Sequence, residues 1–285
     1  MQSRASPGRP DDAAFGALAP SPIEELARRI GHRAPAVFWG RWLCSLLLWP
    51  SGGRSGRAFD VAVFGTQKAR LHPHDNICEK RVFIAPHFWD SRERAALREF
   101  IASGAGPLAF VDVGANAGLY ALFAASAARA AGRAIRVVAI EPAAVMRARM
   151  AFNFAASSVD ATILPFAATS APGPVGLAVN LENRGMSRIA ETGGERVEGR
   201  PLYALVSDGG LAAVDVMKID IEGGEFAALS AFFRDAPQSL HPKLLIAETS
   251  QDDPAHSAKA LVLDNGYAVK LETRQNTIFE RRYSL

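Results

Sequence analysis

The stretch Val111-Asp112-Val113-Gly114-Ala115-Asn116-Ala117-Gly118 decides the fold of this chain. An apolar run ends at the acidic Asp112, and a helical pattern begins after Gly118, which predicts a strand, a turn and a helix. Gly114 permits a tight turn and close approach of the backbone to a ligand, and Gly118 permits packing of the helix near the strand. The loop is not of the G-x-G-x-x-G type, because Asn116 stands at its middle position. The charge of Asp112 suits a cationic ligand better than a pyrophosphate, although an ordinary turn between strand and helix has the same pattern.

From Leu108 onward, short apolar runs alternate with longer helical patterns. The predicted strands are Leu108–Val113, Ile135–Ile140, Ala161–Phe166, Val214–Ile219 and Leu244–Ala247. The predicted helices are Leu119–Ala131, Ala143–Ser157, Glu225–Phe233 and Asp253–Asn265. The alternation predicts right-handed crossovers and an α/β fold with a mostly parallel sheet, covered by helices on both faces. An antiparallel hairpin is expected at the end, from Tyr267–Glu272 and Thr277–Arg281.

A second acidic residue ends the second predicted strand, in Ile140-Glu141-Pro142. A carboxylate at this position accepts hydrogen bonds from the two hydroxyls of a ribose. Pro142 ends the strand and prepares the next helix. Together, Asp112 and Glu141 describe a site for a nucleoside that bears a cationic group. S-adenosylmethionine has both features, a ribose with two hydroxyls and a positively charged sulfonium.

Carboxylates also cluster where the fourth strand meets its helix, in the run KIDIEGGE from Lys218 to Glu225. Ligands of open parallel sheets bind at the carboxyl ends of the strands, which places Asp220 over the reacting centre. Glu225 falls in the first turn of a helix, where a favourable interaction with the helix dipole is by itself a sufficient reason for an acidic residue. Lys218 is expected to pair with a neighbouring carboxylate.

Glu248 ends the fifth strand, in the run LLIAE. If the fourth and fifth strands are neighbours, Asp220 and Glu248 lie close enough to share a divalent cation through oxygen ligands. Alternatively, one of the two stays protonated while the other acts as a base. A capping role for Glu248 is a third interpretation, and the sequence assigns no residue as a metal ligand.

The segments VDVGANAG, IEP, KIDIEGGE and LLIAE occur in this order at the expected strand ends and resemble the FkbM family of S-adenosylmethionine-dependent methyltransferases. The resemblance runs from about Phe110 to Glu248. It implies the seven-stranded, Rossmann-like class I methyltransferase fold, the cofactor S-adenosyl-L-methionine, and O-methylation of sugar or polyketide hydroxyls. The cofactor-binding residues that it implies, with their neighbours, are Asp112, Gly114, Ala115, Asn116, Gly118, Glu141, Pro142, Phe166 and Ala167. Its acidic block corresponds to Asp220, Glu222 and Glu225.

The sequence departs from similar proteins at three places. Thr249 and Ser250 stand where a histidine often follows the strand-five glutamate, which leaves the general base open. Gly185-Met186-Ser187 matches a Gly-x-Ser-like stretch only loosely. After the third strand, Phe166-Ala167-Ala168 offers no carboxylate for an adenine amino group, so backbone contacts and apolar stacking are expected to hold the base.

The function predicted from these motifs is methyl transfer to a hydroxyl of a sugar, glycan or secondary metabolite. Asp220 is expected nearest the acceptor, as base or metal ligand, with Glu222 and Glu248 assisting. Two alternatives are an oxidoreductase of the NAD type, which the missing G-x-G-x-x-G disfavours, and a nucleoside-binding module without catalysis. Arg184 and Arg188 lie in the long segment before the fourth strand, either as contacts for an anionic acceptor or as solvated surface residues.

The first part of the chain carries fewer signals. Residues 1–22 are expected to form a flexible tail, residues 23–105 an accessory region, and residues 106–285 the cofactor-binding domain. Within the accessory region, Pro22–Ile30 and Ser91–Ser103 are predicted helices, and Phe59–Phe64 and Arg81–Ile84 are strand-like runs. A further group of residues could be considered as zinc ligands, namely His72, His74, Cys78 and His87. Their spacing is not that of known zinc-ligand sets, so packed or surface positions are expected instead.

The composition limits the partners and the compartment. The 285 residues include two cysteines and carry a net charge of +3, which indicates neither a disulfide framework nor a nucleic-acid partner. The longest apolar run, Trp42–Trp49, is too short to span a membrane, so a cytoplasmic location is expected. The aromatic residues of Val37–Trp49 are expected to pack on the main domain, with contact to a membrane surface as the alternative. The partner is predicted to be a small-molecule or glycan acceptor, and the oligomeric state is left open.

Overall fold

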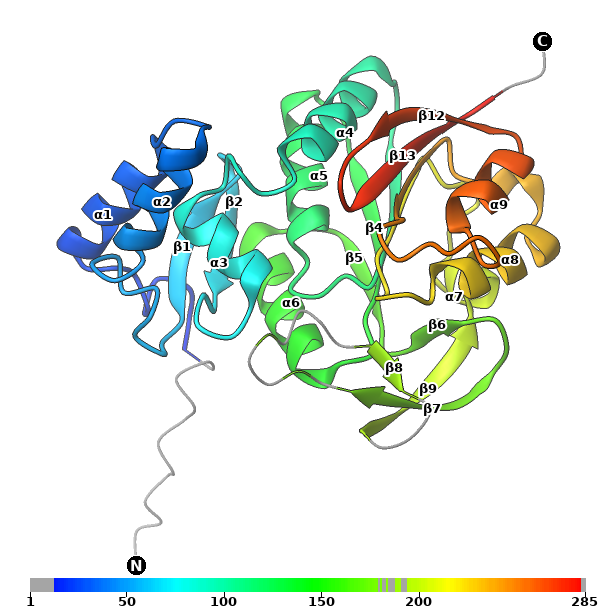
Figure 1. The fold of residues 1–285 in the computed structure, drawn as a ribbon, viewed down its shortest axis with the longest axis horizontal. Coiled ribbons are helices and arrows are strands. Elements are labelled where there is room, and N and C mark those ends of the chain that lie inside the picture. Colours follow the sequence, from blue (N-terminus) through cyan, green and yellow to red (C-terminus); the bar gives the residue numbers. More distant parts are fainter. Residues whose placement is uncertain (1–12, 179, 181–182, 184–187, 191–193, 283–285) are drawn as a thin grey trace, which may run out of the picture. The chain divides into compact units, whose positions relative to one another are not determined.

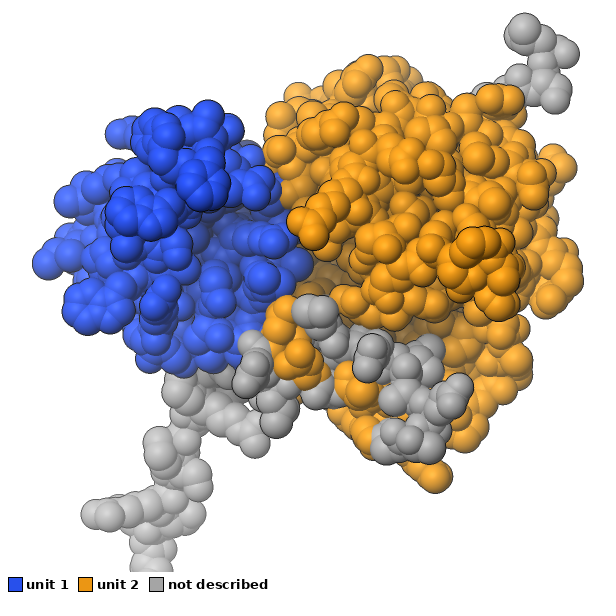
Figure 2. All heavy atoms as spheres, in the orientation of Figure 1, with its two compact units in different colours: residues 1–89 blue, residues 90–285 orange. Residues whose placement is uncertain are grey.

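A computed structural model describes residues 13–178, 180, 183, 188–190 and 194–282 of the chain, without the side chains of residues 188–190. The chain forms two compact units, which Figure 2 shows in separate colours, with the boundary between Trp89 and Asp90. The helix α4 (Ser91–Ser103) therefore belongs to the second unit, whereas the sequence analysis placed the start of that domain at residue 106. Arg184 and the stretch from Gly185 to Ser187 lie outside the described residues, as does the side chain of Arg188.

The second unit is built on the predicted sheet, which has seven strands. In spatial order these are β12 (Tyr267–Glu272), β13 (Asn276–Arg281), β11 (Leu244–Glu248), β10 (Val216–Ile219), β3 (Leu108–Val113), β4 (Ile135–Ile140) and β5 (Ala161–Leu164). The strands from β11 to β5 pair in parallel, and β13 pairs antiparallel with both of its neighbours. The predicted class I fold, with its terminal hairpin, is confirmed.

Helices cover both faces of this sheet (Figure 1). On one side lie α4, α5 (Leu119–Ala130) and α6 (Ala144–Ser157), and on the other α7 (Leu202–Asp208), α8 (Glu225–Asp235) and α9 (Ala258–Asp264). A short 3-10 helix, η2 (Gln238–Leu240), follows α8. The middle strands β3, β10 and β11 are almost wholly buried, which explains why their sequences are continuous apolar runs rather than alternating ones.

The chain between β5 and β10 forms a second, smaller sheet. Its order is β6 (Ala167–Thr169), β9 (Glu195–Pro201), β7 (Gly173–Ala178) and β8 (Arg188–Ala190). The predicted third strand, Ala161–Phe166, ends earlier than expected, because the chain leaves the large sheet after Leu164 and enters the small sheet at Ala167. This change of sheet brings Phe166 to the carboxyl-end edge of β4 and β5.

The first unit contains α1 (Pro22–His32), α2 (Phe38–Leu47), the hairpin of β1 (Phe59–Val63) and β2 (Gln67–Leu71), and α3 (Ile77–Ile84). A capping box between Ser21 and Glu24 starts α1. The buried Asp60 forms an ion pair with Arg70 and accepts the backbone N–H groups of Gly16 and Leu18, so the end of the expected tail is held against β1.

Two expectations for the first unit are wrong. Arg81–Ile84 is helical rather than a strand, because the Asn76 side chain accepts the N–H groups of Cys78 and Glu79 and so starts α3. The aromatic residues at Phe38, Trp39, Trp42 and Trp49 are not packed, and their exposed fractions lie between 59% and 87%.

Two further expectations concern a zinc site in this unit and membrane-spanning segments in the chain. His72 contacts the buried carboxylate of Glu79 at 3.3 Å, which supports a packed residue rather than a zinc ligand. Among the described residues, no helix has the length and apolar character needed to cross a bilayer.

Candidate active site

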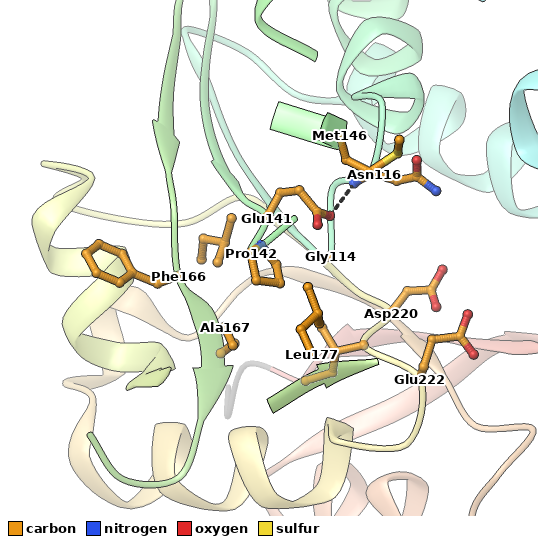
Figure 3. Close-up of a pocket in the computed structure, with 13 residues that line it drawn as sticks. Gly114, Asn116, Glu141, Pro142, Met146, Phe166, Ala167, Leu177, Asp220 and Glu222 are labelled. Atoms are coloured by element: carbon orange, nitrogen blue, oxygen red, sulfur yellow. Dashed lines mark hydrogen bonds between the residues drawn. The ribbon is translucent and has the colours of Figure 1, made fainter. Parts of the chain in front are cut away.

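A hollow opens at the carboxyl ends of β3, β4 and β10, where the predicted motifs meet (Figure 3). The hollow is partly open to solvent and, with that open space included, encloses about 530 Å3. Its lining residues are Gly114, Asn116, Ile140, Glu141, Pro142, Met146, Phe166, Ala167, Ala168, Leu177, Asp220, Ile221 and Glu222. Eight predicted site residues are therefore brought together. Asp112, Ala115, Gly118 and Glu248 do not line the hollow.

The glycine loop after β3 forms one side of this hollow. Gly114 has a φ of +72°, and a Cβ at this position would overlap the backbone carbonyl oxygen of Asp220. The N–H of Gly114 donates to the carbonyl of Ile140 at 2.9 Å, which fixes the loop to the end of β4. Gly118 has a different role from the predicted one, because its close neighbours are Met150 and Phe154 of α6 rather than the strand.

Glu141 joins this loop to the end of β4. One carboxylate oxygen accepts the N–H of Asn116 and the other accepts the N–H of Ala143, each at 2.9 Å. Burial raises the pKa of Glu141, although both hydrogen bonds act in the opposite direction. Each oxygen retains a lone pair, so the carboxylate can still accept hydrogen bonds from a ligand in the hollow.

Part of the lining of the hollow is apolar. Met146 at the start of α6 packs with Leu177 of β7, and Pro142 and Phe166 also line the hollow (Figure 3). The guanidinium of Arg200 lies over the ring of Phe166, 4.8 Å from its centre. The lining residues that follow β5, namely Phe166, Ala167 and Ala168, include no carboxylate.

Asp112 lies beneath the glycine loop with 1% of its surface exposed. Its carboxylate oxygens make no close hydrogen bond with a described residue. Burial raises the pKa of Asp112 to about 6, although the nearby Lys218 and the backbone N–H of Ala121 act to lower it. The burial of this carboxylate is therefore only partly compensated.

The turn after β10 presents two carboxylates to the hollow. Asp220 and Glu222 point to the same side of it (Figure 3). Glu222 has a φ of 56°, an uncommon conformation for a residue other than glycine. Burial, with the charges of Asp220 and Glu248, raises the pKa of Glu222 to about 7.

Glu225 holds this turn in place from the first residue of α8. Its two oxygens accept the N–H groups of Ile221 at 2.6 Å and Gly223 at 2.9 Å. Burial raises the pKa of Glu225 to about 7. Interaction with the helix dipole is therefore not the whole role of Glu225. Its side chain also fixes the backbone that carries Asp220 and Glu222.

Glu248 lies behind Asp220, since β10 and β11 are neighbours as predicted. Its Oε1 accepts the Ser250 hydroxyl at 2.7 Å, and its Oε2 is buried. Burial raises the pKa of Glu248, and the charge of Asp220 and a side-chain hydrogen bond between the two carboxyl groups act in the same direction.

The metal interpretation rests on one group of carboxylates. One oxygen each from Asp220, Glu225 and Glu248 lies within 4.8 Å of the others. However, both oxygens of Glu225 already accept backbone N–H groups, and Asp220 forms an ion pair with Lys218. These contacts explain why the three carboxylates lie together, since they hold the turn after β10 in place. We therefore assign no metal ion to them.

Sequence reasoning did not identify Met146, Ile140, Ala168, Leu177 and Ile221 as lining residues. Met146 lies four residues after Pro142, close behind the second predicted strand, and this position could have identified it as a lining residue. Leu177 had no such signal, because β7 reaches the hollow only through the pairing of the small sheet.

Comparison with known proteins gives a family match and a set of similar folds. Residues 112–268 match the Methyltransferase FkbM domain. A search of curated proteins finds no match to the chain.

Three solved structures illustrate the fold similarity. A precorrin-6y C5,15-methyltransferase from Geobacter metallireducens is 14% identical, with a TM-score of 0.42 over 68% of this chain and 88% of that one. A SAM-dependent methyltransferase from Agrobacterium tumefaciens is 11% identical, with a TM-score of 0.42 over 79% and 69%. TrmK from M. capricolum, in complex with S-adenosyl-homocysteine, is 10% identical, with a TM-score of 0.38 over 65% and 66%.

Proposed function

We propose that this chain, because it belongs to the Methyltransferase FkbM domain family, transfers the methyl group of S-adenosylmethionine to a hydroxyl oxygen of a small-molecule or glycan acceptor. The observation that carries the proposal is the hollow itself. It combines a ribose-type carboxylate, an apolar wall and a pair of acceptor-side carboxylates at the ends of adjacent strands.

The residues around the hollow fit this cofactor part by part. Glu141 offers lone pairs to the ribose hydroxyls, and the wall of Pro142, Met146, Phe166 and Leu177 offers apolar surface to the adenine. The absence of a Cβ at Gly114 leaves room for the backbone of the Asp220 turn beside the loop. The buried carboxylate of Asp112 lies beneath the loop, and its negative charge would favour a positively charged sulfonium nearby.

S-adenosylmethionine, when bound, supplies a methyl group that its positive sulfur already activates. The protein must therefore orient the acceptor hydroxyl and receive its proton. The acceptor oxygen forms a bond to the methyl carbon while the carbon–sulfur bond breaks, and the electron pair of that bond returns to sulfur.

We propose that Asp220 accepts the proton of the acceptor hydroxyl. Its side chain is 38% exposed and reaches the hollow, and its charge is balanced by Lys218 at 3.0 Å. Glu222, with a pKa of about 7, holds the acceptor beside it by a hydrogen bond, and Glu248 assists from behind Asp220 without meeting the acceptor. Glu225 positions the turn and does not meet the acceptor.

The charge around the acceptor side favours a neutral hydroxyl compound. Four carboxylates gather at this edge, namely Asp220, Glu222, Glu225 and Glu248. A phosphate backbone at the same place would be repelled, which disfavours a nucleic-acid acceptor.

The test is incubation of the protein with methyl-labelled S-adenosylmethionine and a panel of glycans, polyols, small hydroxylated metabolites and RNA. We expect label in an ether of a hydroxylated acceptor, and transfer slowed by at least about 100-fold in the Asp220→Asn variant. Transfer to RNA would overturn the acceptor class. Binding of S-adenosylhomocysteine without transfer to any acceptor would favour a binding module, and binding of NAD in its place would favour an oxidoreductase.

A further inference from the structure

In the described part of the chain, most of the exposed large apolar side chains lie on or beside the helices α1 and α2. Of the thirteen large apolar side chains that are exposed among the described residues, nine lie between residues 23 and 49. We call these nine the α1–α2 surface: Ile23, Leu26, Ile30, Val37, Phe38, Trp39, Trp42, Leu46 and Trp49. Such a concentration in 27 residues is not the scattered exposure that is normal for a soluble surface.

The spacing of these residues follows the helices. In α2, Phe38, Trp42 and Leu46 recur every four residues, whereas the buried residues of the helix are Gly40 and Cys44. In α1, Ile23, Leu26 and Ile30 are exposed, whereas Ala27, Arg28 and Gly31 are buried. Each helix therefore presents to solvent the apolar stripe that a helix ordinarily buries.

Small residues allow the two helices to meet on their other faces. The Sγ of Cys44 donates to the carbonyl oxygen of Gly31 at 3.4 Å. Figure 1 shows α1 and α2 side by side in the first unit. Their exposed stripes are thus fixed by the fold of this unit.

Positive charge predominates around this surface, where Glu24 and Glu25 are the acidic residues of α1. Residues 26–59 contain six arginines and no acidic residue. Arg28, Arg29 and Arg57 pair with Glu24 or Glu25. The exposed Arg33, Arg41 and Arg54 form no ion pair with a carboxylate of the described residues.

We propose that the α1–α2 surface docks on a lipid bilayer that contains anionic headgroups. Indole rings favour the boundary between headgroups and acyl chains, and three of the four tryptophans of the chain lie on this surface. The phosphates of the lipid supply the negative charge that Arg33, Arg41 and Arg54 lack in the protein. With only 10 residues, α2 lies in the plane of the interface.

Other occupants fit this surface less well. A two-fold dimer would set the same surface against itself and bring Arg33, Arg41 and Arg54 of both copies together, while Glu24 and Glu25 are already paired with other arginines. Residues 1–12 contain one large apolar side chain, Met1, so that segment offers little apolar cover.

The test measures binding of the full chain to vesicles by sedimentation. One set of vesicles is phosphatidylcholine alone, and the other contains about one third phosphatidylglycerol. We expect at least tenfold more binding to the anionic vesicles, with weaker binding as salt rises. Tryptophan emission should shift to shorter wavelength on binding, because Trp89 is already buried and the other three tryptophans are exposed.

Two variants and a matched control identify the surface. The triple change Trp39→Ala, Trp42→Ala and Trp49→Ala should reduce vesicle binding at least tenfold. The triple change Arg33→Gln, Arg41→Gln and Arg54→Gln should remove the preference for anionic vesicles. The control Leu263→Ala with Val269→Ala removes exposed apolar side chains of the second unit and should bind vesicles as the wild type does.

Binding of S-adenosylhomocysteine, which the surface variants should retain, verifies that each variant folds. Three outcomes would overturn the proposal. They are no vesicle binding by the wild type, equal binding by the tryptophan variant and the control, and a stable dimer that dissociates in the tryptophan variant.

Discussion

The ammonium of Lys218 lies 3.0 Å from Oδ2 of Asp220, and the lysine side chain is 7% exposed while the aspartate side chain is 38% exposed. The cation is therefore buried behind a carboxylate that faces the hollow. Lys218 stands opposite Asp112 in the register of β10 and β3, and its ammonium also lies 3.5 Å from the carbonyl oxygen of Gly114. One lysine thus links the two turns that would hold the cofactor and the acceptor.

Replacement of Asp220 by Asn should reduce turnover about 100-fold to 10,000-fold, the usual contribution of a positioned proton acceptor. The affinity for S-adenosylhomocysteine should change less than about threefold. Rates of methyl transfer and calorimetric titration measure the two effects. Glu198→Gln is the control, since Glu198 is an exposed residue of β9 outside the hollow. Unchanged turnover in Asp220→Asn would refute the assignment of the proton.

Replacement of Glu141 by Ala should weaken binding of S-adenosylhomocysteine by about 10-fold to 100-fold. A hydrogen bond to a charged group contributes about 1.5–3 kcal/mol, and this carboxylate also orders the N–H groups of Asn116 and Ala143. Calorimetry measures the affinity, and thermal unfolding separates lost contacts from lost structure. A folded variant with wild-type affinity would show that the ribose lies elsewhere.

Gly114→Ala and Gly132→Ala form a matched pair. Both glycines have positive φ, +72° and +67°, and an added Cβ meets no atom within 4 Å at Gly132 but overlaps the Asp220 carbonyl oxygen at Gly114. Each change costs about 1–2 kcal/mol for the left-handed backbone. Gly114→Ala should in addition weaken S-adenosylhomocysteine binding more than tenfold, because the turn after β10 must move. Equal affinities of the two variants would contradict the close approach of the two turns.

The raised pKa of Glu222 predicts a dependence of stability on pH. In the folded chain its pKa is about 7 rather than 4.5, so the folded state holds this proton more tightly than the unfolded state does. Its contribution to stability is therefore greatest at low pH and is lost as pH rises from about 4.5 to about 7. Glu222→Gln removes this loss.

Thermal unfolding without cofactor checks this prediction. The melting temperature of Glu222→Gln, relative to that of the wild type, should be higher at pH 8 than at pH 5. The control Glu198→Gln should show a difference that does not vary with pH. A difference for Glu222→Gln that stays constant across this range would argue against a raised pKa.

The sheet was predictable from the sequence because its middle strands are buried on both faces. Leu108–Val113 and Ile135–Ile140 were predicted with the bounds that the structure has, since a continuous apolar run followed by a glycine or a proline leaves few alternatives. The ends of Ala161–Phe166 were less certain, because the transfer of the chain to a second sheet depends on pairing with β9.

The site was predictable where a motif lies at a strand end. Glu141, Gly114 and Asp220 meet at one hollow for this reason. Side chains whose position depends on distant pairing, such as Leu177, left no local signal. Arg81–Ile84 was mistaken for a strand because the cap at Asn76 outweighed the apolar, β-branched pattern that follows it.

The central claim is that the ends of β3, β4 and β10 bind a sulfonium nucleoside. A crystal structure of the protein with S-adenosylhomocysteine tests it most directly. We predict ribose hydroxyls within hydrogen-bond distance of Glu141, the adenine against Met146 and Leu177, and the sulfur on the side of Asp220. Electron density for the ligand at any other place, with this hollow filled only by water, would contradict the account.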